Sequence, residues 1–223
     1  MAMQQIQFDE QQFQLNAINA VADVFDGQYP ADGAKLQVLQ AELAQEGLLA
    51  GVSQDFSVKG NNLQLTDEHI AKNVQQIQEK NGIELPSFKE TIEHGKNFTI
   101  EMETGTGKTY VYIRSALEMA RRYGWRKFMI IVPSVAIKEG VLNAIETMRT
   151  HLEAEYDDVG YFNAGIYDSK NVAAIKEFAA SDDVELLIAT IDSFNKESNL
   201  MNNPQEAIAV SYTHLTLPTT PYV

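Results

Sequence analysis

Residues 97–109 read NFTIEMETGTGKT and join three local patterns. The apolar run Phe98–Met102 predicts a buried strand. The Gly-rich loop Thr104–Thr109 follows directly, and the next residues, Tyr110–Tyr123, have helical spacing with Gly124 placed to end the helix. Strand, Gly-rich loop and helix in this order form the context that a phosphate-binding loop requires.

Each residue type in the loop has a chemical reason to be there. A side chain at Gly105 or Gly107 would block the approach of a polyphosphate to backbone N–H groups. Lys108 brings a positive charge to the β- and γ-phosphates and is the candidate catalytic residue, and the Thr109 hydroxyl can ligate Mg²⁺. The predicted cofactors are therefore ATP and Mg²⁺. The predicted nucleotide-binding residues in the loop are Thr104, Gly105, Thr106, Gly107, Lys108 and Thr109.

One feature of the loop leaves a plainer interpretation open. The general phosphate-loop pattern has a Gly at the position of Met102, so the match is not complete. A Gly-containing turn between a strand and a helix, with an exposed Lys, would have the same local sequence.

Composition limits the class of protein. The chain has 223 residues, is 44% hydrophobic and has no Cys, which excludes disulfides, thiolate metal sites and a thiol nucleophile. The amino terminus is polar and acidic, without a secretory signal, and no apolar run is long enough to span a membrane. These features predict a cytoplasmic protein without membrane contact.

The charge balance is unusual for a nucleic-acid-binding protein. Asp and Glu number 31 against 17 Lys and Arg, a net charge of −14. Dedicated DNA-binding modules are usually basic. A large motor can still hold nucleic acid through backbone and hydroxyl contacts in a cleft.

Strands alternate with helices through much of the chain, which predicts an α/β fold with a parallel sheet flanked by helices. Helical patterns cover Asp9–Phe25, Ala34–Ala50, Thr66 or Asp67 to Lys80, one turn at Ser87–Glu90, Val135 to about Arg149, and Asn171–Ala180. The two further predicted strands are Lys127–Val132, as an apolar run buried on both faces, and Val184–Thr190. Residues 157–170 predict a loop with a possible strand. In the first helix, Asp9 is the expected N-cap and Phe13, Ala17, Val21 and Val24 form the expected apolar stripe.

Four segments resemble the restriction (R) subunit of type III restriction enzymes, which are superfamily 2 (DEAD/DEAH-type) helicase-like DNA translocases. They are Met102–Tyr112, Ile131–Val141, Tyr167–Lys170 and Ala189–Asn195, and the resemblance covers most of residues 6–203. Met102 is usual in that family. The resemblance implies a P-loop RecA-like sheet, ATP-dependent translocation on double-stranded DNA coupled to its cleavage, and a modification methyltransferase subunit as partner.

The resemblance also implies roles for residues outside the loop. Gln14 matches the Gln with which such motors contact adenine, although a surface Gln on a Gln-rich helix is the alternative. Pro133, Ser134 and Thr190 match positions that contact the nucleic-acid backbone. Helix capping and strand termination would also account for these three residues.

One part of the family pattern is missing. The Asp-Glu motif that completes the Mg²⁺ site has no counterpart after the third predicted strand; Asp192 is a weaker rival for the metal-binding position because no Glu follows it. The resemblance thus implies a RecA-like domain incomplete at its C-terminus, with little hydrolysis by this piece alone. The hypothetical divisions are an adenine-motif helix and loop (1–33), a helical insertion (34–90), part of the first ATPase domain (91–210) and a probable non-native or disordered tail (211–223).

Two other function classes stay open. One is a P-loop ATPase that does not act on DNA, which the acidic composition mildly favours. The other is a non-catalytic fragment whose helical region docks a partner.

Overall fold

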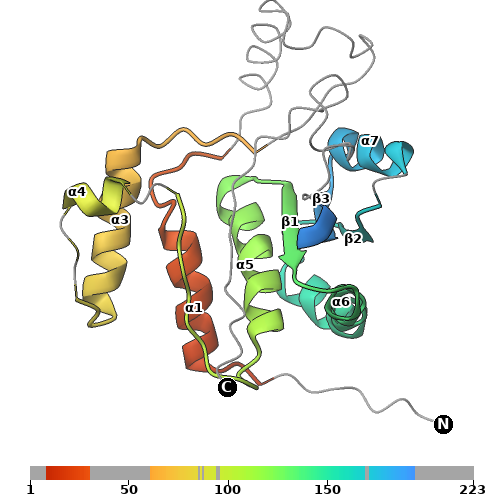
Figure 1. Ribbon diagram of the computed structural model, residues 1–223, viewed down its shortest axis with the longest axis horizontal. Helices are drawn as coiled ribbons and strands as arrows, with labels where there is room; N and C mark the ends of the chain where they lie inside the picture. Colours follow the sequence, from red (N-terminus) through yellow and green to blue (C-terminus); the bar gives the residue numbers. More distant parts are fainter. Residues whose placement is uncertain are drawn as a thin grey trace, which may run out of the picture.

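The computed structural model describes residues 9–30, 61–84, 86, 88–93, 96–168 and 171–193, and Figure 1 traces them by colour. The helices are α1 (Gln12–Asp23), α3 (Asp67–Lys80), α4 (Phe88–Glu93), α5 (Lys108–Tyr123), α6 (Val135–Glu155) and α7 (Val172–Ala180), with a short 3-10 turn η1 (Ile191–Ser193). The strands are β1 (Lys127–Val132), β2 (Phe162–Ile166) and β3 (Val184–Thr190). The helix expected at Ala34–Ala50 and the tail 211–223 lie outside the described residues.

The three strands form one parallel sheet in the order β1-β3-β2. β3, the last strand in the chain, lies in the middle of the sheet, and its last residue, Thr190, is in register with Val132 of β1. The α/β prediction is confirmed: helices flank an open parallel sheet, an arrangement consistent with a RecA-like fold.

Helices cover both faces of the sheet. Leu186 and Ile188 of β3 belong to the main core with α5 and α6, whereas Leu187 and Ala189 point to the opposite face and pack with α7. Burial on both faces therefore describes the central strand β3 best. β1 is buried only at Lys127 and Val132 and half-buried between them, which makes the expected two-sided burial of that strand only partly right.

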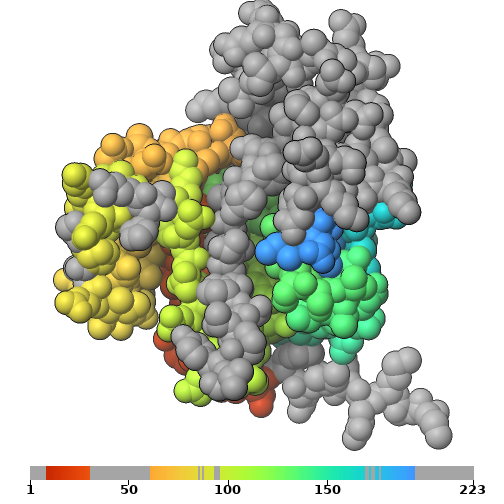
Figure 2. Space-filling model, viewed as in Figure 1, coloured from red at the N-terminus to blue at the C-terminus, as the bar shows by residue number. Residues whose placement is uncertain are grey.

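A second apolar cluster fixes α1 beside α5. Phe25, Trp125 and Tyr123 form its centre, and the Phe25 and Trp125 ring centroids lie 4.8 Å apart in an edge-to-face arrangement. Ile70 of α3 packs on the same cluster. Together with α4, α3 lies on the flank of α1 that faces away from the sheet (Figure 1; Figure 2).

The strand expected at Phe98–Met102 is wrong. This segment is extended, but within the described ranges it joins no ladder, and its residues alternate between half-buried and exposed. Its apolar side chains turn instead toward the second cluster, where the Phe98 ring meets the edge of Phe25 at 6.4 Å. A strand exists only through hydrogen bonds to a neighbour, and an apolar run alone does not supply that neighbour.

The side of β1 away from β3 pairs with no other described strand, and a side chain bonds its first residue there. The Asn61 amide accepts from the Lys127 N–H at 3.0 Å and donates to the Lys127 carbonyl at 2.6 Å. This pair of hydrogen bonds reproduces the contacts that a neighbouring strand would make, because a backbone donor and acceptor are both satisfied.

Local capping signals were mostly correct. Ser134 caps α6 by accepting from the Ile137 N–H, Thr66 caps α3, and Gly124 ends α5 in the left-handed conformation at φ 66°. α6 continues past the expected end at Arg149 because Leu152, fully buried, extends its apolar stripe by another turn.

The start of α1 differs from the prediction. The helix begins at Gln12, its N-cap position is Gln11 without a side-chain cap, and Asp9 lies outside it. Val21 and Val24 of the expected stripe are buried as predicted, but the stripe runs through Ile18 and Ala22 and leaves out Phe13, which is 48% exposed. Within the described ranges, no helix has the length and apolar character needed to cross a membrane.

Candidate functional site

The Gly-rich loop makes a tight turn that leads directly into α5. Gly105 and Gly107 have φ values of 82° and 87°, in the left-handed region that a side chain disfavours. Lys108 is the first residue of α5, so the N–H groups of the first turn of this 16-residue helix and its positive dipole end face the loop. The loop geometry therefore suits an anion.

Hydrogen bonds within the loop hold its present shape. The Glu103 carbonyl accepts from the Thr106 hydroxyl at 2.7 Å and from the Lys108 ammonium at 2.8 Å. Lys108 is exposed enough to exchange this carbonyl for another oxygen ligand, because the bond lies at the surface.

Gln14 reaches this loop from a helix 92 positions earlier in the chain. Its side-chain Nε2 donates to the Thr106 carbonyl at 2.8 Å. A Cβ at Gly107 would lie only 2.6 Å from the same Nε2, so glycine there leaves room for the amide as well as for the backbone turn. Gln14 precedes Ile18 by one helical turn on the stripe that packs against α5, which directs it toward the helix N-terminus.

A groove of about 250 Å³ begins beside Lys108 and Thr109 and continues along β1. All residues from Phe128 to Pro133 line it, so it follows the edge of the strand rather than one face. Tyr112 also lines the groove; burial raises the pKa of its phenol, and a hydrogen bond with the Thr109 side chain opposes that shift. The candidate Mg²⁺ ligand Thr109 thus sits at the mouth of a mainly apolar groove.

The predicted nucleic-acid contacts lie at one edge of the sheet. Because Val132 and Thr190 are paired in register, Pro133 and Ser134 leave β1 next to the end of β3. The Thr190 hydroxyl lies 3.0 Å from that of Ser193, a residue that the sequence analysis missed. The signal for it was a second hydroxyl three residues after Thr190, in the turn η1.

Among the described residues, no cluster of metal-ligating side chains joins Thr109. Asp192 is exposed in η1, and in the parts of the chain that the structure describes no group of three or more His, Asp or Glu side chains is arranged to hold a metal ion. The metal roles of Thr109 and Asp192 stay predictions.

Comparison with known families agrees with the arrangement of loop and sheet. Residues 45–212 match the family model described as "Type III restriction enzyme, res subunit". The chain belongs to this family. The match spans α3 through β3, so it includes the Gly-rich loop, the sheet and the predicted contact edge.

Three curated Res subunits are similar to parts of this Res-family chain. That of the EcoPI enzyme from Escherichia phage P1 is 37% identical over 98 residues, 43% of this chain and 10% of the relative. That of StyLTI from Salmonella typhimurium is 37% identical over 120 residues, which cover 51% of this chain and 11% of the relative. That of EcoP15I from Escherichia coli is 34% identical over 98 residues, which cover 42% of this chain and 10% of the relative. The chain matches about a tenth of the length of these curated relatives.

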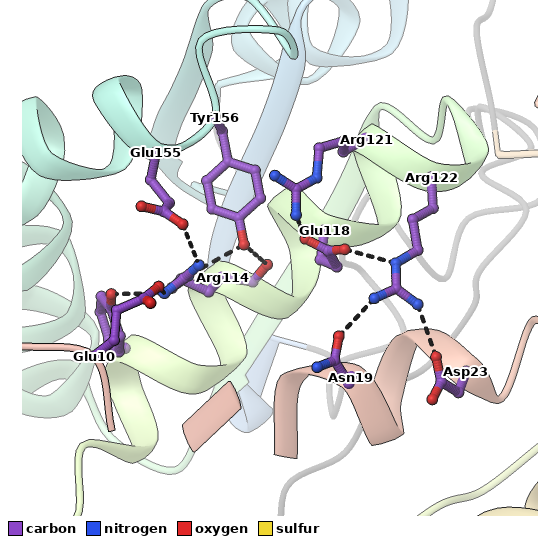
Figure 3. A network of polar contacts seen from close by, with 10 residues as sticks. Glu10, Asn19, Asp23, Arg114, Glu118, Arg121, Arg122, Glu155 and Tyr156 are labelled. Atoms are coloured by element: carbon purple, nitrogen blue, oxygen red, sulfur yellow. Dashed lines mark hydrogen bonds and ion pairs between the residues drawn. The ribbon is translucent and has the colours of Figure 1, made fainter. Parts of the chain in front are cut away.

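Two arginines of α5, which sequence reasoning missed, organise the contacts around the Res-family loop helix (Figure 3). Arg114 is 3% exposed; its guanidinium donates to the hydroxyls of Tyr156 and Tyr110 and to the Glu155 carboxylate. Burial by itself lowers the pKa of Arg114, but the hydrogen bond that it donates to Tyr156 and the charge interactions with the two tyrosines outweigh burial, and the net direction is upward. No motif marks these arginines, since several of their partners, such as Glu155 for Arg114 and Asp23 for Arg122, come from other helices.

Proposed function

We propose that this chain is an ATP-binding motor region of a type III restriction endonuclease Res subunit. ATP with Mg²⁺ would drive translocation on double-stranded DNA coupled to cleavage, in the longer protein to which such a region belongs. One observation supports it above the others: the Gln14 amide lies against the same loop that presents Lys108 and Thr109.

Each group at the loop has a role in this proposal. The backbone N–H groups around Gly105 and Gly107 and the α5 dipole hold the phosphates, while Lys108 leaves the Glu103 carbonyl to stabilise charge on the transferring phosphoryl group. Thr109 contributes its hydroxyl to Mg²⁺. Gln14 can both donate to and accept from the edge of an adenine base, because a side-chain amide has both functions.

The nucleic-acid side of the proposal rests on the sheet edge. Ser134 is exposed just after β1, and Thr190, which is only 8% exposed, ends the neighbouring strand β3. Pro133 lies between β1 and the capped helix α6. Such groups contact phosphate without reading sequence. Sequence recognition would belong to a modification methyltransferase subunit, and the complete enzyme would work in the cytoplasm.

Calorimetric titration of Mg²⁺-ATP into the chain tests the nucleotide site. Lys108→Ala should abolish measurable binding, and Lys72→Ala, which removes an exposed lysine of α3, should leave it unchanged. Equal binding by the wild type and Lys108→Ala would contradict the proposal and favour the non-catalytic docking fragment. We expect hydrolysis by this chain alone to be slow; robust turnover that depends on Lys108 would contradict that expectation.

The net charge of −14 favours a second candidate, a P-loop ATPase that does not act on DNA. Double-stranded DNA distinguishes the two candidates. The motor proposal predicts that DNA tightens ATP binding or raises residual turnover, with an effect that weakens as salt increases. An ATP site that responds to Lys108→Ala but not to DNA at any salt concentration would favour the second candidate.

A further inference from the structure

Arg122, in the last turn of α5, uses all three of its guanidinium nitrogens at once. Nε donates to Glu118 at 2.6 Å, Nη1 to Asp23 at 2.7 Å and Nη2 to Asn19 at 2.6 Å (Figure 3). Glu118 belongs to α5 itself, and its carboxylate is 6% exposed and also pairs with Arg121. Glu118 therefore fixes the direction of the Arg122 guanidinium, a planar fork of N–H donors, and this fork then donates hydrogen bonds to two residues of α1.

The two helices run in the same direction. Gln14 contacts Thr106 where both helices begin, and Asp23 and Asn19 contact Arg122 where both end. Nine residues separate Gln14 from Asp23, so the two contacts lie about 14 Å apart along α1. A shift of α1 along α5 would break the Gln14 contact and the Arg122 contacts together.

The rest of the interface between α1 and α5 is poorly suited to fixing that axial position. Its buried α1 residues, Ile18, Val21 and Ala22, are apolar, and apolar contact is not directional. Tyr123 adds one hydrogen bond, to the Ala22 carbonyl at 2.9 Å. A guanidinium fork held by three oxygen acceptors adds geometric specificity as well as energy.

We propose that Arg122 is a positioning residue for the nucleobase site: by fixing the register of α1 on α5, it holds the Gln14 amide at the phosphate loop. The inference rests on the proposed ATP-binding function and deepens it. The base selectivity of the loop is then set from the far end of α5, by a residue that touches no nucleotide. Binding of the triphosphate itself depends on Lys108 and the loop backbone, so replacing Arg122 should not change it.

Titrations with Mg²⁺-ATP, Mg²⁺-GTP and Mg²⁺-tripolyphosphate test this separation. Arg122→Ala should weaken ATP binding about tenfold, the value of roughly one hydrogen bond to the base, with GTP and tripolyphosphate affinities kept within about twofold. Gln14→Ala should behave in the same way. The double variant should be no weaker than either single variant, because both remove one interaction.

Matched variants separate positioning from general loss of structure. Arg149→Ala removes an arginine of α6 that pairs with Glu146 and Glu153, and it should leave all three affinities unchanged. Arg122→Lys keeps the charge but loses the fork, and should still lose selectivity for ATP. If Arg122→Ala does not fold, Asn19→Ala removes a single acceptor of the fork and should lower the ATP-to-GTP affinity ratio in the same direction.

Three results would overturn the inference. They are an unchanged ATP-to-GTP ratio in Arg122→Ala or Asn19→Ala, an equal loss for all three ligands, and additive losses in the double variant. Each presupposes Lys108-dependent ATP binding by the wild type. Absence of that binding would instead overturn the proposed function, so the two failures are distinguishable.

Discussion

The Nε of Arg114 donates to the phenol oxygen of Tyr156 at 3.1 Å, and both side chains are almost completely buried. Arg114 lies on α5, the helix that follows the Gly-rich loop, and Tyr156 is the C-cap of α6, the helix whose N-cap is Ser134. The guanidinium also lies over the Tyr110 and Tyr156 rings, 5.4 Å from each centroid. This contact joins α5, which starts at the Gly-rich loop, to α6, which starts where β1 ends.

Replacing Arg114 by Leu should lower the free energy of unfolding by about 3 kcal/mol or more, because the buried polar groups that bind the guanidinium would lose their hydrogen-bond partner. Urea denaturation measures the loss. Arg149→Leu is the control; its guanidinium is more exposed, pairs with Glu146 at the surface and donates one hydrogen bond to the Phe162 carbonyl, so a smaller loss of about 1–2 kcal/mol is expected. Equal losses for the two variants would contradict the structural role of Arg114.

The Tyr156 hydroxyl should make stability fall at alkaline pH. Burial raises the pKa of Tyr156 to about 12, although the hydrogen bond with Arg114 and the charge of Arg114 oppose that rise. Below about pH 10 the phenol is protonated in the folded and unfolded states, and its full contribution is present. As pH rises toward 12, the unfolded chain ionises first, and the free energy of unfolding falls by about 2–3 kcal/mol.

Denaturation at a series of pH values measures that slope. Tyr156→Phe should make the slope shallower without removing it, because burial also raises the pKa of Tyr112 and Tyr123. Tyr161→Phe changes a tyrosine that is 78% exposed and should leave the slope as in the wild type. Identical slopes for all three proteins would show that Tyr156 does not contribute.

Gly107→Ala should abolish nucleotide binding, because the new Cβ would sit 2.6 Å from the Gln14 amide in addition to straining a left-handed residue. Gly160→Ala is a close control: its φ is also 87°, and a Cβ there meets nothing within 4 Å. Both variants should lose about 1 kcal/mol of stability from backbone strain. Calorimetry with Mg²⁺-ATP should separate them, and a Gly107→Ala protein with normal affinity would refute the packing of Gln14 on the loop.

Ser134 should have two separable roles. Ser134→Ala removes the cap of α6 and should cost about 1 kcal/mol of stability, while Ser134→Asp keeps a capping oxygen and should restore it. DNA binding at fixed salt should fall slightly in Ser134→Ala, which loses the hydroxyl proposed to contact phosphate, and further in Ser134→Asp, whose carboxylate repels a phosphate. Thr66→Asp makes the same change at the cap of α3 and should bind DNA like the wild type, whereas an equal loss there would point to net charge alone.

Much of the fold follows from signals a few residues long. Gly124, Ser134 and Thr66 end or begin helices because their backbone or side chain meets a local need, and each was predictable. The strands β1 and β3 were predictable as apolar runs. β2 was only a possible strand within a loop, because its exposed and half-buried residues between Phe162 and Ile166 make a weak apolar pattern.

The errors share a cause in long-range packing. Phe98–Met102 has the apolarity of a strand, but hydrogen bonding to a neighbour decides that state. Phe13 fits a helical stripe, yet the side of α1 that is buried depends on where α5 lies, and that places Gln14 and Ile18 inward. No local pattern contains either piece of information.

By itself, the sequence determined the Gly-rich loop, the helix that begins at Lys108 and the capped ends of α3, α5 and α6, because backbone conformation and capping act within a few residues. Only the tertiary structure decided that Gln14 meets Thr106 across 92 positions, that β3 lies between β1 and β2, and that Arg114 and Arg122 join α5 to its neighbours. Those contacts depend on how apolar faces pack, and the free energy of burying an apolar face depends on its area and not on which partner covers it.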